Sequence, residues 1–228
     1  MAYTQKQVPF YLFNVADNRI FGFLFYICIT KKNRMEANNK ILSFCLALLT
    51  AVFSGCADDG YEYDDYHCNL TIDNSVHLDN TLAASMNPMV PGIFCKISYT
   101  LKGGAKWFVF ENNANQSSES IFNAVDDRLN SHLRIGKQNA LIIGYGNAGS
   151  PARFYAYDGQ CPNCFDLNKI PLREHRLTLS FGGIATCPTC HRQYDLNAGG
   201  YITKGDDGNM LKPYRAETTG PNGVLHVY

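Results

Sequence analysis

Two short cysteine motifs have a spacing that suits a metal ion. They occupy residues 161–164 (CPNC) and 187–190 (CPTC), and 22 residues separate them. A short C-P-x-C turn holds both of its sulfurs on one side of the backbone, so two such turns that face each other place four sulfurs around one point. This geometry suits zinc, a single iron or a two-iron cluster. The predicted metal ligands are Cys161, Cys164, Cys187 and Cys190.

Two other chemistries fit the same four thiols. In an oxidising compartment they can form disulfides, or one pair can act as a redox-active dithiol. Both turns carry proline directly after the first cysteine, which indicates two copies of one structural device. A thiol-exchange motif normally occurs once, at the start of a helix, and neither motif here precedes a helical apolar pattern. The sequence therefore favours a metal site over disulfides or a dithiol, without deciding among them.

The remaining residues predict no catalytic group. The six histidines are scattered without an H-E-x-x-H pattern, and the chain contains no G-x-S-x-G elbow or phosphate loop. Charge is balanced, with 20 basic and 20 acidic residues, so nothing predicts an electrostatic surface for nucleic acid. We assign no catalytic residue, expect no nucleic-acid partner, and leave open whether the protein is a component of an oxidoreductase.

The N-terminal region predicts export. Residues 1–34 do not read as folded protein, and we interpret them as an extension upstream of a start at Met35. A polar region and an apolar run over 41–53 follow, and residues 53–56 (FSGC) resemble a bacterial lipobox, in which Cys56 is acylated. An ordinary signal peptide and a transmembrane anchor are the alternatives, although 13 apolar residues are short for a span. We therefore predict a lipoprotein signal peptide that ends at residue 55. The lipid on Cys56 would be the contact with the membrane of the bacterial cell envelope, at the outer membrane or the periplasmic face.

The mature chain divides into a predicted flexible tether over 56–74 and a domain over 75–228. The tether begins with an acidic, aromatic run that has no apolar periodicity. The domain contains short apolar runs separated by glycine-rich turns and many aromatic residues, which is typical of a mainly β fold. Apolar residues four apart over 117–133 predict its one short helix. Cys68 and Cys95 are either a disulfide or two buried free thiols.

Both cysteine motifs follow predicted strands. The alternating segment 153–158 runs into the first motif, and a hairpin over 177–186 leads into the second. A site on loops at the ends of strands is held in place by the sheet beneath it. We therefore expect the four sulfurs to converge at one end of a rigid sheet.

The second motif and its surroundings resemble a cluster-binding loop of Rieske domains. Residues 187–195 (CPTCHRQYD), with a Gly-Gly turn at 199–200, are similar to the Rieske pattern Cys-Pro-x-His-Gly-x-x-Phe/Tyr-Asp. Residues 154–162 similarly resemble the strand and the first loop. The resemblance is clear over 153–228 and extends over about 75–228. It implies a small β-sandwich-like domain with a two-loop metal-binding subdomain.

The differences from the Rieske pattern affect which metal we expect at the site. Rieske loops each supply one cysteine and one histidine, whereas Cys164 and Cys190 stand where the histidines would be. Four thiolates would lower the potential of a two-iron cluster toward about −400 mV, the range of plant-type ferredoxins. The leader has no twin arginines, which implies export of an unfolded chain, and zinc can bind afterwards without assembly machinery. We therefore favour zinc in a structural or binding role over a 2Fe-2S electron-transfer centre. His191, where Rieske loops have glycine, and Tyr194 are expected beside the ligands.

Overall fold

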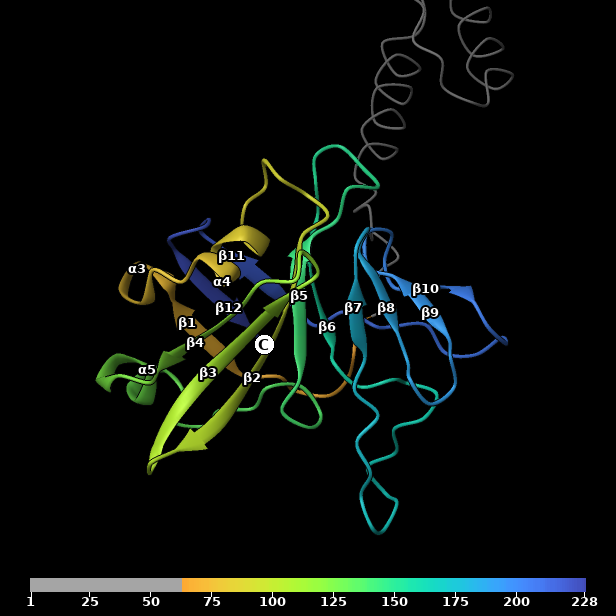
Figure 1. Ribbon diagram of the computed structural model, residues 1–228, viewed down its shortest axis with the longest axis horizontal. Coiled ribbons are helices and arrows are strands. Elements are labelled where there is room, and N and C mark those ends of the chain that lie inside the picture. Colours follow the sequence, from red (N-terminus) through yellow and green to blue (C-terminus); the bar gives the residue numbers. More distant parts are fainter. Residues whose placement is uncertain (1–62) are drawn as a thin grey trace, which may run out of the picture. The chain divides into compact units, whose positions relative to one another are not determined.

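The computed structural model describes residues 63–228 (Figure 1). This part of the chain is mainly β, as predicted, with antiparallel sheets and a few short helices. The signal peptide, the start at Met35 and the acylation of Cys56 all fall outside the described residues and remain predictions. Within residues 63–228, none of the helices has the length and apolar character needed to cross a membrane.

The described strands form three antiparallel sheets. The sheet of five strands has the order β4-β3-β2-β5-β6, the sheet of four strands β10-β9-β8-β7, and the sheet of three strands β1-β12-β11. The strands are β1 Leu70–Asp73, β2 Phe94–Lys102, β3 Ala105–Asn112, β4 Ser117–Ile121, β5 Leu141–Tyr145, β6 Phe154–Asp158, β7 Thr178–Ser180, β8 Ile184–Thr186, β9 Gln193–Asp195, β10 Tyr201–Lys204, β11 Ala216–Thr218 and β12 Val224–Val227.

The five-stranded sheet is covered on both faces. Leu141 and Ile143 of β5 pack in one core with side chains of β1 and β12, and Ile142 between them packs in a second core with side chains of β8 and β9. This split follows from the strand itself, because successive side chains point to opposite faces of a sheet. In Figure 1, β7 to β10 accordingly lie on one side of β5 and β6, and β1, β11 and β12 lie on the other.

Strand pairing brings the two cysteine motifs together. Strand β6 pairs with β5 and ends at Asp158, three residues before the first motif. Strand β8 ends at Thr186, which pairs with Gln193 of β9, so the second motif closes the β8–β9 hairpin. Each motif therefore begins within three residues of a strand end, as the sequence predicted.

The helix predicted over 117–133 is wrong in its first part. Ser117–Ile121 is strand β4, which pairs antiparallel with β3 from Trp107 opposite Ile121 to Glu111 opposite Ser117. Pairing along this edge outweighed the four-residue apolar spacing, which is a weak signal over so short a segment. The helix that forms, α5 Ala124–Leu129, begins later, at a capping box in which Asn123 and Asp126 each accept a backbone hydrogen bond.

Two further short helices occur among the described residues, where the sequence predicted a single one in the domain. They are α3 Asn74–His77 and α4 Asn80–Ser85. The carboxylates of Asp73 and Asp79 cap them by accepting a backbone hydrogen bond from Ser75 and Leu82, respectively. Helices of four and six residues carry too little apolar periodicity to be recognised in a sequence.

The folded domain also begins earlier than residue 75. Strand β1 Leu70–Asp73 pairs in register with β12, and Leu70 and Ile72 are fully buried. Asp64 forms an ion pair with Lys137 at 2.7 Å, and its backbone N–H donates to the carbonyl of Pro213. The last part of the tether predicted over 56–74 therefore belongs to the domain, because the two apolar side chains of β1 alternate and enter the main core.

Cys68 and Cys95 are free thiols rather than a disulfide. Both are buried in the main core, where the Cys68 thiol donates to the carbonyl of Arg134 at 3.1 Å and the Cys95 thiol to that of Lys96 at 3.6 Å. Burial raises the pKa of Cys68 to about 12 and also raises the pKa of Cys95. The sequence allowed either a disulfide or two buried free thiols, and the structure shows the buried free thiols. Both are protonated at neutral pH.

Candidate metal centre

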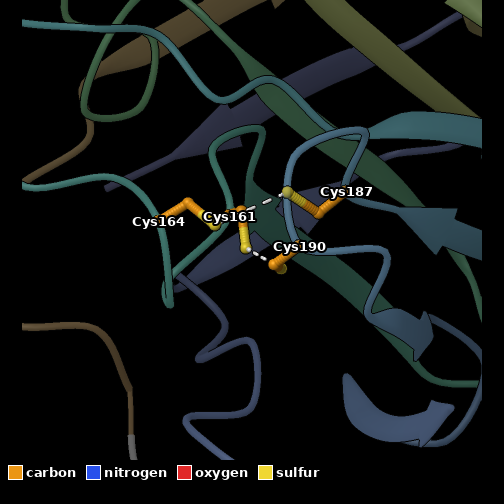
Figure 2. A group of neighbouring side chains, drawn as sticks. All are labelled: Cys161, Cys164, Cys187 and Cys190. Carbon is orange, nitrogen blue, oxygen red and sulfur yellow. Dashed lines mark hydrogen bonds between the residues drawn. The ribbon is translucent and has the colours of Figure 1, made fainter. Parts of the chain in front are cut away.

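The four predicted ligands come together in the structure. Figure 2 shows their side chains converging from the loop after β6 and from the turn between β8 and β9. All four Sγ atoms lie within 4.8 Å of one another. Two close contacts join the two motifs: Sγ of Cys161 lies 3.7 Å from Sγ of Cys190, and Sγ of Cys164 lies 3.8 Å from Sγ of Cys187. Cys161 and Cys187 are buried, and Cys164 and Cys190 are partly exposed.

These distances fit a single tetrahedral ion. Zinc binds thiolate sulfur at about 2.3 Å, and two corners of a tetrahedron of that radius are about 3.8 Å apart. The contacts between the motifs already have this length, so one ion fits among the sulfurs with little movement of the backbone. The residues present can therefore hold a metal ion.

Backbone hydrogen bonds hold each motif as a tight turn. In the first, the N–H groups of Cys164 and Phe165 both donate to the carbonyl of Cys161. In the second, the N–H of His191 donates to the carbonyl of Cys187 at 2.9 Å, and the N–H of Cys187 donates to that of Arg192 at 3.0 Å. Both turns are thus shaped by hydrogen bonds of the main chain, which direct the two sulfurs of each motif to one side.

Tyr194 lies beside the ligands, as predicted. Its hydroxyl is 3.2 Å from Sγ of Cys161 and accepts a hydrogen bond from the Asn163 amide at 2.9 Å. The same amide donates to the carbonyl of Asn209 at 2.8 Å. When Cys161 is ionised, the hydroxyl of Tyr194 is placed to donate its proton to the sulfur and to stabilise the thiolate.

His191 contributes its backbone rather than its ring to the turn. The side chain is exposed, and the residue has a left-handed backbone with φ of 59°. This conformation favours glycine, because a Cβ there is strained.

Replacing His191 with glycine should leave the metal centre intact. We expect His191→Gly to keep the metal affinity within about twofold and to raise the free energy of unfolding by up to ~1 kcal/mol, since strain is relieved. Metal titration and chemical denaturation measure the two quantities. His191→Ala is the control, because it removes the ring and keeps the strained backbone. A loss of affinity in both variants would instead give the imidazole a role at the site.

The thiols differ in acidity. Burial raises the pKa of Cys161 to about 11, against the hydrogen bond from Tyr194, and burial together with the neighbouring thiols raises the pKa of Cys164. Burial also opposes ionisation of Cys190, but hydrogen bonds from the backbone and guanidinium of Arg192 outweigh it and lower the pKa of Cys190 to about 6. A metal ion that binds at neutral pH therefore meets a thiolate at Cys190 and must displace protons from Cys161 and Cys164.

Two residues that the sequence analysis did not single out, Arg192 and His175, support the site. The Arg192 guanidinium donates to the carbonyls of Asp206 and Asp207 as well as to Cys190, and it ties a third loop to the ligands. The ring of His175 is 2.9 Å from the hydroxyl of Thr189 and links the two motif loops. Arg192 could have been recognised from the sequence, because it lies two residues after the ligand Cys190. No feature of the sequence points to His175.

Asp158 holds the segment that leads into the first motif. Its buried carboxylate accepts hydrogen bonds from the backbone N–H of Lys137 and of Gln160, each at 2.7 Å, and from the hydroxyl of Tyr214 at 2.5 Å. Burial raises the pKa of this carboxyl, and the three donors oppose the rise. Gln160 directly precedes Cys161, so Asp158 positions the chain where it enters the metal centre.

The chain matches no protein-family model, no curated protein and no solved structure. The structure itself defines the class: a mainly β domain with a cluster of four cysteines that can hold a metal ion. Any narrower assignment depends on the chemistry of that cluster.

Proposed function

We propose that this domain binds one zinc ion on Cys161, Cys164, Cys187 and Cys190 in a structural role, as the folded part of an exported, lipid-anchored protein. The observation that carries the proposal is the convergence of four sulfurs within 4.8 Å, with contacts of 3.7 and 3.8 Å between the motifs. Four thiolates with no open position are typical of structural zinc sites.

The rival function is electron transfer by a 2Fe-2S cluster on the same residues, and the resemblance of both loops to Rieske cluster loops is what favours it. Such a cluster places two ligands on each of two irons, with sulfides bridging the metals. Ligands of different irons then lie farther apart than the edge of one tetrahedron. Here all four sulfurs lie within 4.8 Å of one another, which favours a single ion, and export of an unfolded chain favours zinc over iron.

A structural role agrees with the size of the sheet that carries the second motif. Strands β7, β8 and β9 have three residues each and β10 has four. The core beneath them includes two of the ligands, Cys161 and Cys187. A small sheet with so few paired residues gains stability from a metal that ties the loop after β6 to the β8–β9 hairpin.

Two features support a Rieske-like arrangement. The motifs lie on two loops that face each other, one after β6 of the five-stranded sheet and one in the β8–β9 hairpin of the four-stranded sheet, and two loops are what the resemblance leads one to expect. The left-handed backbone at His191 also suits the glycine of the Rieske pattern. Export to the bacterial cell envelope, and anchoring to its membrane by a lipid on Cys56, rest on the sequence alone.

Metal analysis of the purified full chain tests the metal assignment. We expect about one zinc per chain, four thiols that become reactive only after chelation, and no visible absorption, since zinc has a filled d shell. The free thiols Cys68 and Cys95 remain unreactive in the folded protein because they are buried. Two irons with acid-labile sulfide and a visible spectrum would establish the electron-transfer alternative. A metal-free chain with two disulfides would refute both.

The lipid anchor has its own test. Cells that express the full chain should incorporate labelled fatty acid into the protein, and Cys56→Ser should abolish the label. Cys68→Ser is the matched control, because that residue lies in the folded domain. Retention of the label in the Cys56 variant would exclude acylation at this residue.

A further inference from the structure

The loop between the first motif and β7 has an apolar tip. Leu167, Ile170 and Leu172 are 46%, 97% and 41% exposed. In Figure 1 this connection from β6 to β7 reaches well beyond the sheets, at the bottom of the view. Large aliphatic side chains placed in water this way are costly unless they contact another surface.

The same tip is cationic. Lys169 and Arg173 are exposed and alternate with the apolar residues, and no acidic residue lies between positions 167 and 173. The acidic residues at the base are engaged locally: Glu174 pairs with Arg176 at 2.7 Å, and Asp166 accepts from the N–H of Asn168 at 2.9 Å. The tip therefore presents apolar groups and two positive charges together.

The other two apolar side chains in the described part of the chain that are more than 80% exposed, Phe181 and Met89, lack this combination. Phe181 is 89% exposed in the turn between β7 and β8, between Ser180 and Gly182. Met89 and Val90 are 85% and 52% exposed between two prolines. Neither segment has a basic neighbour in sequence, so exposure alone does not distinguish the loop; the pairing of exposure with positive charge does.

We propose that residues 167–173 dock on an anionic lipid bilayer. The aliphatic side chains enter the boundary between headgroups and acyl chains, and Lys169 and Arg173 contact lipid phosphates. Entry is shallow, because the backbone groups of an irregular loop cannot be satisfied in hydrocarbon. This contact is separate from the zinc site and from any lipid on Cys56, and it would set the orientation of the domain on the membrane.

Tryptophan reporters test the contact in the full chain, whatever its N-terminal region binds. Trp107 is the single tryptophan, so the test variant is Trp107→Phe with Ile170→Trp, and the matched control is Trp107→Phe with Phe181→Trp. With vesicles that contain phosphatidylglycerol, the reporter at 170 should shift to shorter wavelength and be quenched by brominated lipid. The reporter at 181 and vesicles of phosphatidylcholine alone should show neither effect.

Charge reversal gives the magnitude. Each cation near an anionic membrane surface contributes about fivefold to binding, so Lys169→Glu with Arg173→Glu should lower the ratio of inserted to free loop by at least about 25-fold. An unchanged zinc content would show that the variant is folded. The proposal is overturned if the reporter at 170 stays in water while the protein is on the vesicles, or if both reporters respond alike. It is also overturned if charge reversal has no effect, or if only a protein partner shifts the reporter.

Discussion

Replacing Cys187 with serine should lower the zinc affinity by more than about 100-fold, the upper cost of removing an outer-shell partner of a metal ligand. Cys187 is fully buried and contributes one of the four sulfurs, so its loss leaves an incomplete tetrahedron. A ligand present at 1,000 times its Kd stabilises a fold by about 4 kcal/mol, and the variant loses most of this stabilisation. Competition with a chromophoric chelator measures the affinity, and denaturation with and without zinc measures the stability.

Cys68→Ala is the matched control for this experiment. Cys68 is equally buried but lies in the main core, outside the four-cysteine cluster. This variant loses stability through packing, by about 1 kcal/mol for a small side chain, while zinc still adds the same increment as in the wild type. Equal zinc affinity in the Cys187 variant and the wild type would show that the four cysteines do not form the zinc site.

Replacing Asp158 with asparagine should destabilise the domain by about 3 kcal/mol. One carboxylate oxygen faces the N–H of Gln160, and the other faces the N–H of Lys137 and the hydroxyl of Tyr214. An amide NH2 in either position therefore meets a backbone donor, which leaves a buried N–H without an acceptor. Chemical denaturation of the zinc-bound full chain measures the loss.

Tyr214→Phe separates the carboxylate from its side-chain partner. It removes one hydroxyl and keeps the ring, so we expect a smaller cost of about 1 kcal/mol. The Asp158 variant should also bind zinc more weakly, because Gln160 precedes Cys161, whereas the Tyr214 variant should bind zinc normally. Equal destabilisation by the two substitutions would show that the carboxylate does not position the backbone at Gln160.

The ligand set could be predicted from sequence because each motif is local. Two residues between the cysteines of a turn fix the relative positions of both sulfurs, independently of the rest of the fold. The strands next to the motifs also show clear alternation of apolar and polar residues. The strands at 153–158 and in the hairpin over 177–186 were predicted for the same reason, because the pattern of apolar residues lies within one short segment. Tyr194 was placed beside the site because it belongs to residues 187–195, the segment that resembles a Rieske loop.

Contacts between distant segments decided the rest. The β4 segment at Ser117–Ile121 became a strand because β3 offered an edge to pair with, and β1 joined the domain because β12 did the same. The hydrogen bonds from Cys68 to Arg134 and from Tyr214 to Asp158, and the His175–Thr189 link, join residues that are 66, 56 and 14 positions apart. A short sequence pattern does not predict such contacts, because they form only after the chain has closed the loops between the two residues. The residue types and spacing of the ligands were thus set by the sequence, and the environment that tunes each thiol was set by the tertiary structure.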